Sequence, residues 1–289
     1  MAPRKQPTVR MAWLGQELIR AREELGLTMS AAAERIDRST GTLSTWENGH
    51  SAPKARDMPY ILDKLEIVDP AKREALITLA RDAAKKGWWH AHVGHISEIH
   101  LDYISLEDAA RRIYVHAPLL VPGLFQTEAY IREIIAAHRI WSTQEAIDRG
   151  VEIRLARQSI LRRTDRDPVR VWAVIDEGAL RRTVGGPDVM REQIRHILEL
   201  ATELPHVTVQ VLPYDAGAHA GMEGPFSLLD IEGLPLIASV TSLTATLYPE
   251  PETVDVYATA HEHIRTKALP SLESLRFLGE LLEAKKGGS

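Results

Sequence analysis

Apolar residues recur every three or four positions along the first 80 residues, which is typical of short amphipathic helices. Leu14 and Leu18 share one face of the first segment, and Gly26 follows it as a residue type that ends helices. Thr28 is a residue type that caps the start of a second helix. The pattern predicts a five-helix bundle, with helices over residues 12–25, 29–36, 40–47, 61–65 and 72–80.

Beyond residue 80 the pattern becomes mixed. Residues 106–115 indicate a helix or a helix-to-strand element, and 116–127 form an apolar loop interrupted by prolines. Alternation of apolar and polar residues predicts strands from about residue 167 onward. The predicted strands cover 169–175, 207–212, 226–231 and 236–240, and the predicted helices cover 128–140, 143–163, 188–200, 252–267 and 271–284.

The predicted fold class is mainly α with an α/β C-terminal domain: an N-terminal five-helix helix-turn-helix bundle followed by a mixed α+β domain. A chain of 289 residues is long enough for two or three domains. We expect a helix-turn-helix domain over 1–80, a junction with a tryptophan pair over 81–100, a helical linker or dimerisation region over 101–166, and an α/β domain over 167–286.

The third predicted helix carries the signal for DNA. Its exposed face offers only small polar groups, from Thr40, Gly41, Thr42, Ser44 and Thr45. A helix must be slim on that face to enter the major groove, where hydroxyls can bond base edges or phosphates. The alternative is a Ser/Thr-rich surface helix with no ligand.

The segment LGLTMSAAAERIDRSTGTLSTWENGHSAPKA resembles the phage Cro-repressor type of helix-turn-helix, also called the xenobiotic-response-element family. The resemblance covers about 60 residues. It implies that the recognition helix ends at the WENG segment, and that Met29 stands where the family usually has Gln. The DNA-binding residues it implies are Thr28, Met29, Ser39, Thr40, Gly41, Thr42, Ser44, Thr45 and Lys54.

An aromatic pair, Trp88 and Trp89, follows the predicted bundle. Such a pair most often anchors one domain on the next; the alternative is an aromatic wall for a ligand or partner. Four histidines lie close by, at positions 90, 92, 95 and 100, but no cysteine completes a familiar zinc set. We therefore expect no metal and no cofactor.

The motifs GWWH, LLVPGLFQTE, RLARQSIL, VMREQIRHILEL and VTVQVLPYDAGAHAG resemble, in order, a domain of unknown function found behind helix-turn-helix heads in regulators of filamentous soil bacteria. The resemblance runs over about 200 residues. Its members are described as antitoxin-like regulators and are commonly encoded beside a small partner protein. The resemblance implies a partner protein for this domain.

Residues 215–224 hold an Asp and a His four positions apart, a possible acid/base pair. No nucleophile elbow or phosphate loop accompanies them, so the chain is predicted not to be an enzyme. The segment suits a recognition loop instead. The residues expected to bind an effector or partner are Trp88, Trp89, Tyr214, His219, Met222 and Phe226.

Charge and composition change this picture little. Residues 1–90 carry 15 Lys/Arg and 12 Asp/Glu, whereas the rest carry 20 and 28, so a mildly basic head precedes an acidic body. Arginines at 154, 157, 162 and 163 are interpreted as a solvated helix face. The absence of cysteine and of a signal-like or membrane-length apolar run favours a cytoplasmic protein.

One helix-turn-helix offers little contact area, so a homodimer on a double-stranded operator is expected. Three functions compete: a regulator controlled by a small partner protein, an antitoxin that neutralises a toxic partner and autoregulates its operon, and a small-molecule-sensing regulator.

Overall fold

The computed structural model describes residues 8–83, 87–92, 98–137, 143–242 and 246–284. The chain divides into two compact units. The head unit holds residues 1–105 together with Glu232–Pro235, and the sheet unit holds 106–231 and 236–289. Each unit is described separately below.

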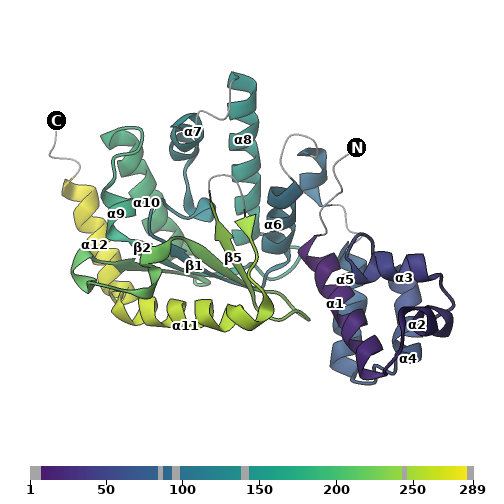
Figure 1. The fold of residues 1–289 in the computed structure, drawn as a ribbon. Coiled ribbons are helices and arrows are strands. Elements are labelled where there is room, and N and C mark those ends of the chain that lie inside the picture. Colours follow the sequence, from purple (N-terminus) through teal and green to yellow (C-terminus); the bar gives the residue numbers. More distant parts are fainter. Residues whose placement is uncertain (1–7, 84–86, 93–97, 138–142, 243–245, 285–289) are drawn as a thin grey trace. The chain divides into compact units, whose positions relative to one another are not determined.

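The head unit is helical (Figure 1). Its first five α-helices confirm the predicted bundle and surround one apolar core built from Leu14, Leu18, Ile36, Leu43 and Ile61 among others. The elements are α1 (Val9–Glu24), α2 (Met29–Arg35), α3 (Thr40–Glu47), η1 (Ala55–Asp57), α4 (Met58–Lys64), α5 (Pro70–Ala83) and η2 (Trp88–His92). Helix α6 (Glu98–Ala109) begins in the head unit and ends in the sheet unit.

Helix boundaries in the head follow from capping. Thr28 accepts a hydrogen bond from the Ala31 amide at 3.2 Å and begins α2, as predicted. Gly26 adopts φ +63°, the left-handed conformation that ends a helix at low cost in glycine. Between α2 and α3 that conformation falls on Asp37, at φ +53°, whose carboxylate accepts a hydrogen bond from the Tyr60 hydroxyl.

In the residues that the structure describes, the sheet unit has six strands in the order β3-β2-β1-β4-β5-β6. Strands β1, β2 and β3 run parallel, and β4, β5 and β6 continue the sheet in antiparallel pairs. The strands are β1 (Arg112–Ala117), β2 (Arg170–Asp176), β3 (Val207–Leu212), β4 (Phe226–Asp230), β5 (Ile237–Thr241) and β6 (Thr246–Leu247).

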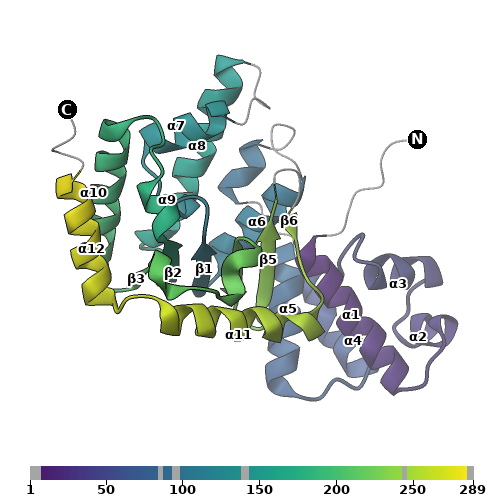
Figure 2. The same cartoon turned by 60° about the vertical axis from the view of Figure 1, so that its left-hand side comes forward.

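Helices cover both faces of this sheet, as expected for buried parallel strands (Figures 1 and 2). Helix α11 crosses one face, where its Val254 and Ile264 pack against Phe226, Leu228 and other strand residues. Helices α7, α8 and α10 lie on the opposite side. The helices are α7 (Glu128–Ala137), α8 (Gln144–Arg157), α9 (Glu177–Arg181), α10 (Pro187–Glu203), α11 (Pro251–Lys267) and α12 (Ser271–Ala284).

The structure differs from the sequence prediction at the start of this unit. Segment 106–115 contains the end of α6 and most of strand β1, which confirms the helix-to-strand alternative, but β1 continues to Ala117, inside the predicted loop. Strand β1 also lies within 101–166, where a helical region was expected, yet it pairs with both β2 and β4. The six residues of β1 have no strong local strand signal, and the strand is stabilised by pairing with β2 and β4, which lie more than 50 positions away in the sequence.

Two smaller differences concern α8 and the interpretation of its arginines. The predicted helix 143–163 ends at Arg157 and continues as a short 3₁₀ turn, η4 (Gln158–Leu161). The arginines are not one solvated face, because Arg157 pairs with buried Glu107, with its Nε 2.8 Å from a carboxylate oxygen. Burial lowers the pKa of Arg154 to about 10.

No helix in the described ranges is long and apolar enough to cross a bilayer.

Candidate DNA-binding interface

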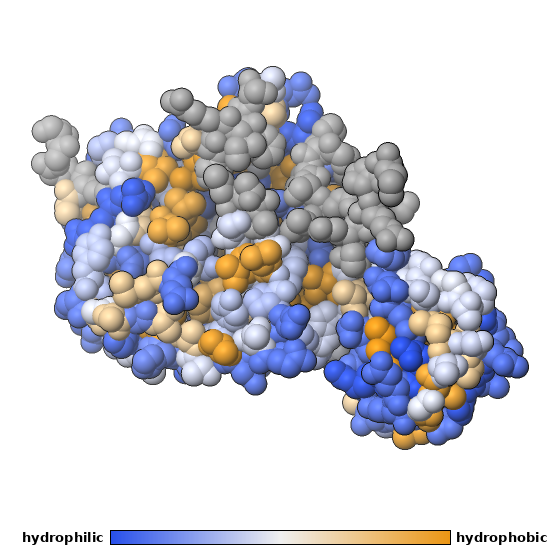
Figure 3. Space-filling view, in the orientation of Figure 1, coloured by the Kyte–Doolittle hydropathy of each residue, from blue (hydrophilic) through white to orange (hydrophobic). Residues whose placement is uncertain are grey.

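Helix α3 has one buried and one exposed face. Leu43 and Trp46 enter the head core at 1% and 8% exposure, whereas Thr40, Gly41 and Thr45 are exposed. Thr42 and Ser44 are half-buried at the margins of that face. The surface over α3 is correspondingly pale in Figure 3, neither strongly apolar nor strongly charged. The exposed face is therefore narrow and rich in hydroxyl groups.

Most of these hydroxyls are already ordered by the helix itself. Ser39 caps α3 by accepting from the Thr42 amide at 3.1 Å, and its hydroxyl lies 2.9 Å from that of Thr42. Thr45 donates to the Gly41 carbonyl at 2.6 Å, and the Asn48 side-chain amide donates to the Ser44 hydroxyl at 3.3 Å. These bonds fix the side chains before any ligand binds, while their oxygens keep free lone pairs.

A glycine on α1 lets α1 and α3 approach closely. A Cβ added at Gly15 would lie 2.4 Å from the Glu47 carbonyl oxygen and 2.6 Å from that of Trp46. Both atoms belong to the backbone, so a small side-chain movement cannot relieve the overlap. Gly15 therefore sets the distance between α1 and the C-terminal end of α3.

An ion pair holds the same end of α3. Arg22 on α1 donates from Nε and Nη2 to the two carboxylate oxygens of Glu47, at 2.8 and 3.1 Å. The Glu47 side chain is 3% exposed, and Arg22 also donates to the Leu27 carbonyl. This hydrogen bond to Glu47 raises the pKa of Arg22. A two-pronged pair of this kind fixes orientation as well as distance.

The remaining predicted DNA-contact residues lie around α3. Thr28 is exposed at the start of α2, and Lys54 is exposed just before η1. Met29 is half-buried and packs against the head core, which accounts for an apolar residue there. Sequence reasoning overlooked Arg38, which lies in the turn before α3 and pairs with Asp57 at 3.5 Å, and exposed Arg56 beside it.

The residues predicted to bind an effector fall into both units. Trp88 and Trp89 lie in η2 of the head unit, in edge-to-face contact with ring centroids 6.0 Å apart. Trp89 is buried and Trp88 is half-buried. His95 lies outside the described residues, and within those described no three potential metal ligands come together. The other predicted effector residues belong to the sheet unit.

In the sheet unit, two of the predicted effector residues contact His116, a buried histidine that sequence reasoning overlooked. The His116 ring on β1 contacts the rings of His219 and Phe226, at 5.9 and 5.5 Å between centroids. It also shares a hydrogen bond with the Gly221 carbonyl at 3.0 Å. Tyr214 and Met222 are instead 63% and 69% exposed. The loop therefore has an ordered inner side and an exposed outer side.

The comparisons with known proteins agree with this division. A family model described as a helix-turn-helix domain matches residues 13–76, and one described as a domain of unknown function (DUF5753) matches residues 101–280. No curated protein matches the chain, and neither does any solved structure. The chain belongs to the family defined by this domain of unknown function, and it carries the domain behind a DNA-binding helix-turn-helix head.

Proposed function

We propose that this protein is a sequence-specific transcriptional regulator that inserts α3 into the major groove of its operator. The observation that carries the proposal is the exposed hydroxyl face of α3, on a helix whose opposite face is buried and whose end is held by Gly15 and Glu47. A slim, pre-ordered helix of this kind can reach base edges. The hydroxyl face also supports the resemblance to Cro-type heads.

Within this proposal the contact residues have two tasks. Thr40, Gly41, Thr42, Ser44 and Thr45 face base edges or adjacent phosphates. The second group positions the head on the sugar-phosphate backbone, where cationic side chains and helix N-termini bind phosphates. Its members are Thr28, Met29, Ser39 and Lys54, together with Arg38 and Arg56.

The test begins with selection of bound sites from a random duplex pool by the full chain. The double variant Thr40→Glu/Thr45→Glu should lose about a hundredfold or more in affinity for the selected site, because two carboxylates would meet phosphates and base acceptors. The control variant, Thr253→Glu/Thr266→Glu, adds the same charge at exposed positions of α11. Equal affinity of both variants, with the fold intact, would show that α3 is not the reading helix.

We further propose that the chain acts as a homodimer and that the domain behind the head receives a signal from a small partner protein. A dimer would place two heads on half-sites about 34 Å apart, one helical turn of DNA. The segments proposed for these tasks are the junction 81–100, the region 101–166 and the domain 167–286. The exposed side chains of Tyr214 and Met222 support a recognition role for the loop that carries them.

The partner proposal has its own measurement. Sedimentation of the full chain, alone and with the product of an adjacent gene, reports dimerisation and complex formation. Tyr214→Ala/Met222→Ala should weaken the complex without changing the affinity for the selected DNA site. An antitoxin role is the second candidate. It requires that expression of the adjacent gene alone arrests growth and that co-expression of this chain restores it.

A further inference from the structure

A cavity of about 350 Å³ in the sheet unit opens at the start of strands β1 and β2. Its charged lining consists of Arg111, Arg112, Arg163, Arg170, Asp167 and Asp230. Four guanidinium groups against two carboxylates give this lining a formal charge of +2. The volume lies at the lower end of the range for small-molecule sites.

Two of the arginines stand side by side. Arg112 and Arg170 are register partners on the parallel strands β1 and β2, so their side chains leave the same face of the sheet about 4.8 Å apart at the backbone. Like charges in this position repel each other, and the effect is unfavourable unless an anion lies between them.

Internal anions compensate these charges only in part. Asp230 is shared, with carboxylate oxygens 3.3 Å from Arg111 and 4.0 Å from Arg112. Within the described part of the chain, the Arg170 side chain has no hydrogen-bond or ion-pair partner, and the Asp167 carboxylate has no ion pair. Arg112 and Arg170 are both exposed, so the cavity is open to solvent and their guanidinium groups are accessible to an anion.

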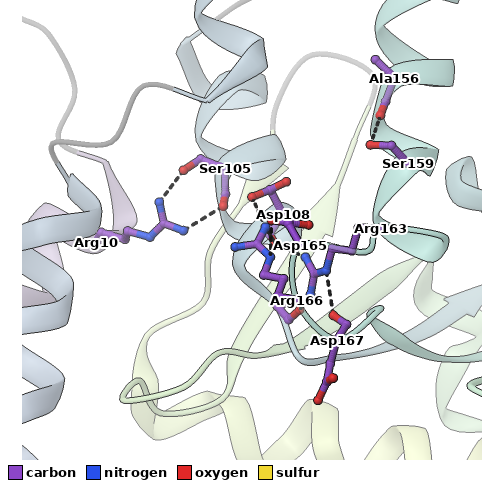
Figure 4. Close-up of polar contacts among 10 residues, drawn as sticks. Arg10, Ser105, Asp108, Ala156, Ser159, Arg163, Asp165, Arg166 and Asp167 are labelled. Carbon is purple, nitrogen blue, oxygen red and sulfur yellow. Dashed lines mark hydrogen bonds and ion pairs between the residues drawn. The ribbon is translucent and has the colours of Figure 1, made fainter.

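A third arginine is locked into the cavity wall. Arg163 donates from Nε to the Asp167 carbonyl at 2.8 Å (Figure 4). It also donates from Nη1 to the Asp108 carbonyl at 2.6 Å and from Nη2 to the Ala110 carbonyl at 3.1 Å. These partners are neutral, so they fix the guanidinium without neutralising it. Arg166 binds the Asp108 carboxylate beside it at 2.6 Å.

We propose that this cavity binds the phosphate group of a small phosphorylated molecule. Arg112 and Arg170 contact the phosphate oxygens through their planar donor pairs, and Arg163 supplies a fixed positive wall. A phosphate dianion matches the +2 charge of the lining, whereas a single carboxylate leaves half of it uncompensated. The Asp167 carboxylate is then positioned to accept a hydrogen bond from a hydroxyl of the rest of the ligand.

The experiment uses the full chain and inorganic phosphate as probe, titrated by calorimetry and by ³¹P NMR against sodium chloride of equal ionic strength. Saturable binding of one phosphate per chain is expected, with acetate binding more weakly. Arg170→Gln should weaken phosphate binding about tenfold or more, the effect of losing one charge-assisted contact. Arg195→Gln removes an equal charge from exposed α10, outside the cavity lining, and should change it less than twofold.

Several results would overturn the proposal: no binding beyond the chloride blank, equal binding of acetate, or equal loss in both variants. If Arg170→Gln weakened duplex binding while phosphate did not bind, the cavity would belong to the DNA footprint instead. The inference is independent of DNA reading, because Thr40→Glu/Thr45→Glu should leave phosphate binding unchanged. Failure of the phosphate-binding proposal is therefore distinguishable from failure of the proposal that α3 reads DNA.

Discussion

Arg22 and Glu47 form a two-pronged ion pair that joins the end of α1 to the end of α3, with both oxygens of a buried carboxylate engaged. The pair lies behind the exposed face of α3, so it can orient that face without touching DNA. Together with Gly15 it determines where the proposed reading helix sits on the head.

Replacing Glu47 with Gln should destabilise the head by about 3 kcal/mol, because Arg22 would keep its charge in a half-buried site with only the exposed carboxylate of Glu23 nearby. Chemical denaturation, followed by tryptophan fluorescence, measures the change. The control Glu23→Gln removes an exposed carboxylate 3.8 Å from the same arginine and should cost less than about 1 kcal/mol. Equal costs would mean that the pair contributes no more than a surface contact.

Gly15→Ala should both destabilise the head and lower affinity for the selected DNA site. The added methyl would lie 2.4 Å from a backbone oxygen of α3, so the two helices must separate. Gly279→Ala in α12 is the matched control, because nothing lies within 4 Å of its added Cβ. That change should stabilise the chain by up to about 1 kcal/mol through helix propensity. A stabilising Gly15→Ala would contradict the close approach.

Ser39→Ala removes the cap of α3 and should cost about 1 kcal/mol of head stability. It should also weaken site binding, since the first turn of α3 would fray near the phosphates. Ser30→Ala on α2 is the comparison, because Ser30 is exposed and does not cap its helix. Thermal unfolding and fluorescence anisotropy give the two measurements. Identical results for both variants would show that the cap is unimportant.

The sheet unit should lose stability as the pH falls from about 6.5 toward 4. Burial lowers the pKa of His261 to about 4, and it lowers that of His116 as well. Since the unfolded histidines take up protons near pH 6.5, protons bind the unfolded state first over this window. The loss from His261 alone is about 1.4 kcal/mol for each pH unit.

His261→Phe tests this assignment, because it preserves a ring against Tyr114 while removing the titrating group. Denaturation at a series of pH values should give a shallower slope for this variant than for the parent chain. His263→Gln, at an exposed position of the same helix, should leave the slope unchanged. An unaltered slope in His261→Phe would assign the acid sensitivity to other groups.

The head could be predicted in detail because its signals are local. The cap at Thr28 and the stop at Gly26 act within four residues of where they stand, and the structure confirms both boundaries. The packing of α1 on α3 could not be predicted in this way. Gly15 contacts residues more than 30 positions away, and nothing in its own helix indicates that contact.

The sheet unit shows the same limit more strongly. Strand β1 exists because β2 and β4 flank it, and its six residues carry no turn signal that separates them from a helix end. The sequence pattern places Arg157 on a solvated face, because its partner, Glu107, lies 50 positions earlier in a buried site. Burial of a charged pair depends on the completed fold, which a pattern of spacings does not contain.

The two faces of α3 also separate the positions at which this head tolerates substitution from the positions that its fold requires. Substitutions at Thr40 or Thr45 fall on the exposed surface, so under the proposed role of α3 new operator preferences are reachable one mutation at a time without disturbing the core. Changes at Leu43 or Gly15 disturb the core or the helix contact instead. Duplicated copies of such a gene could therefore diverge in the promoters they control while their heads remain superimposable.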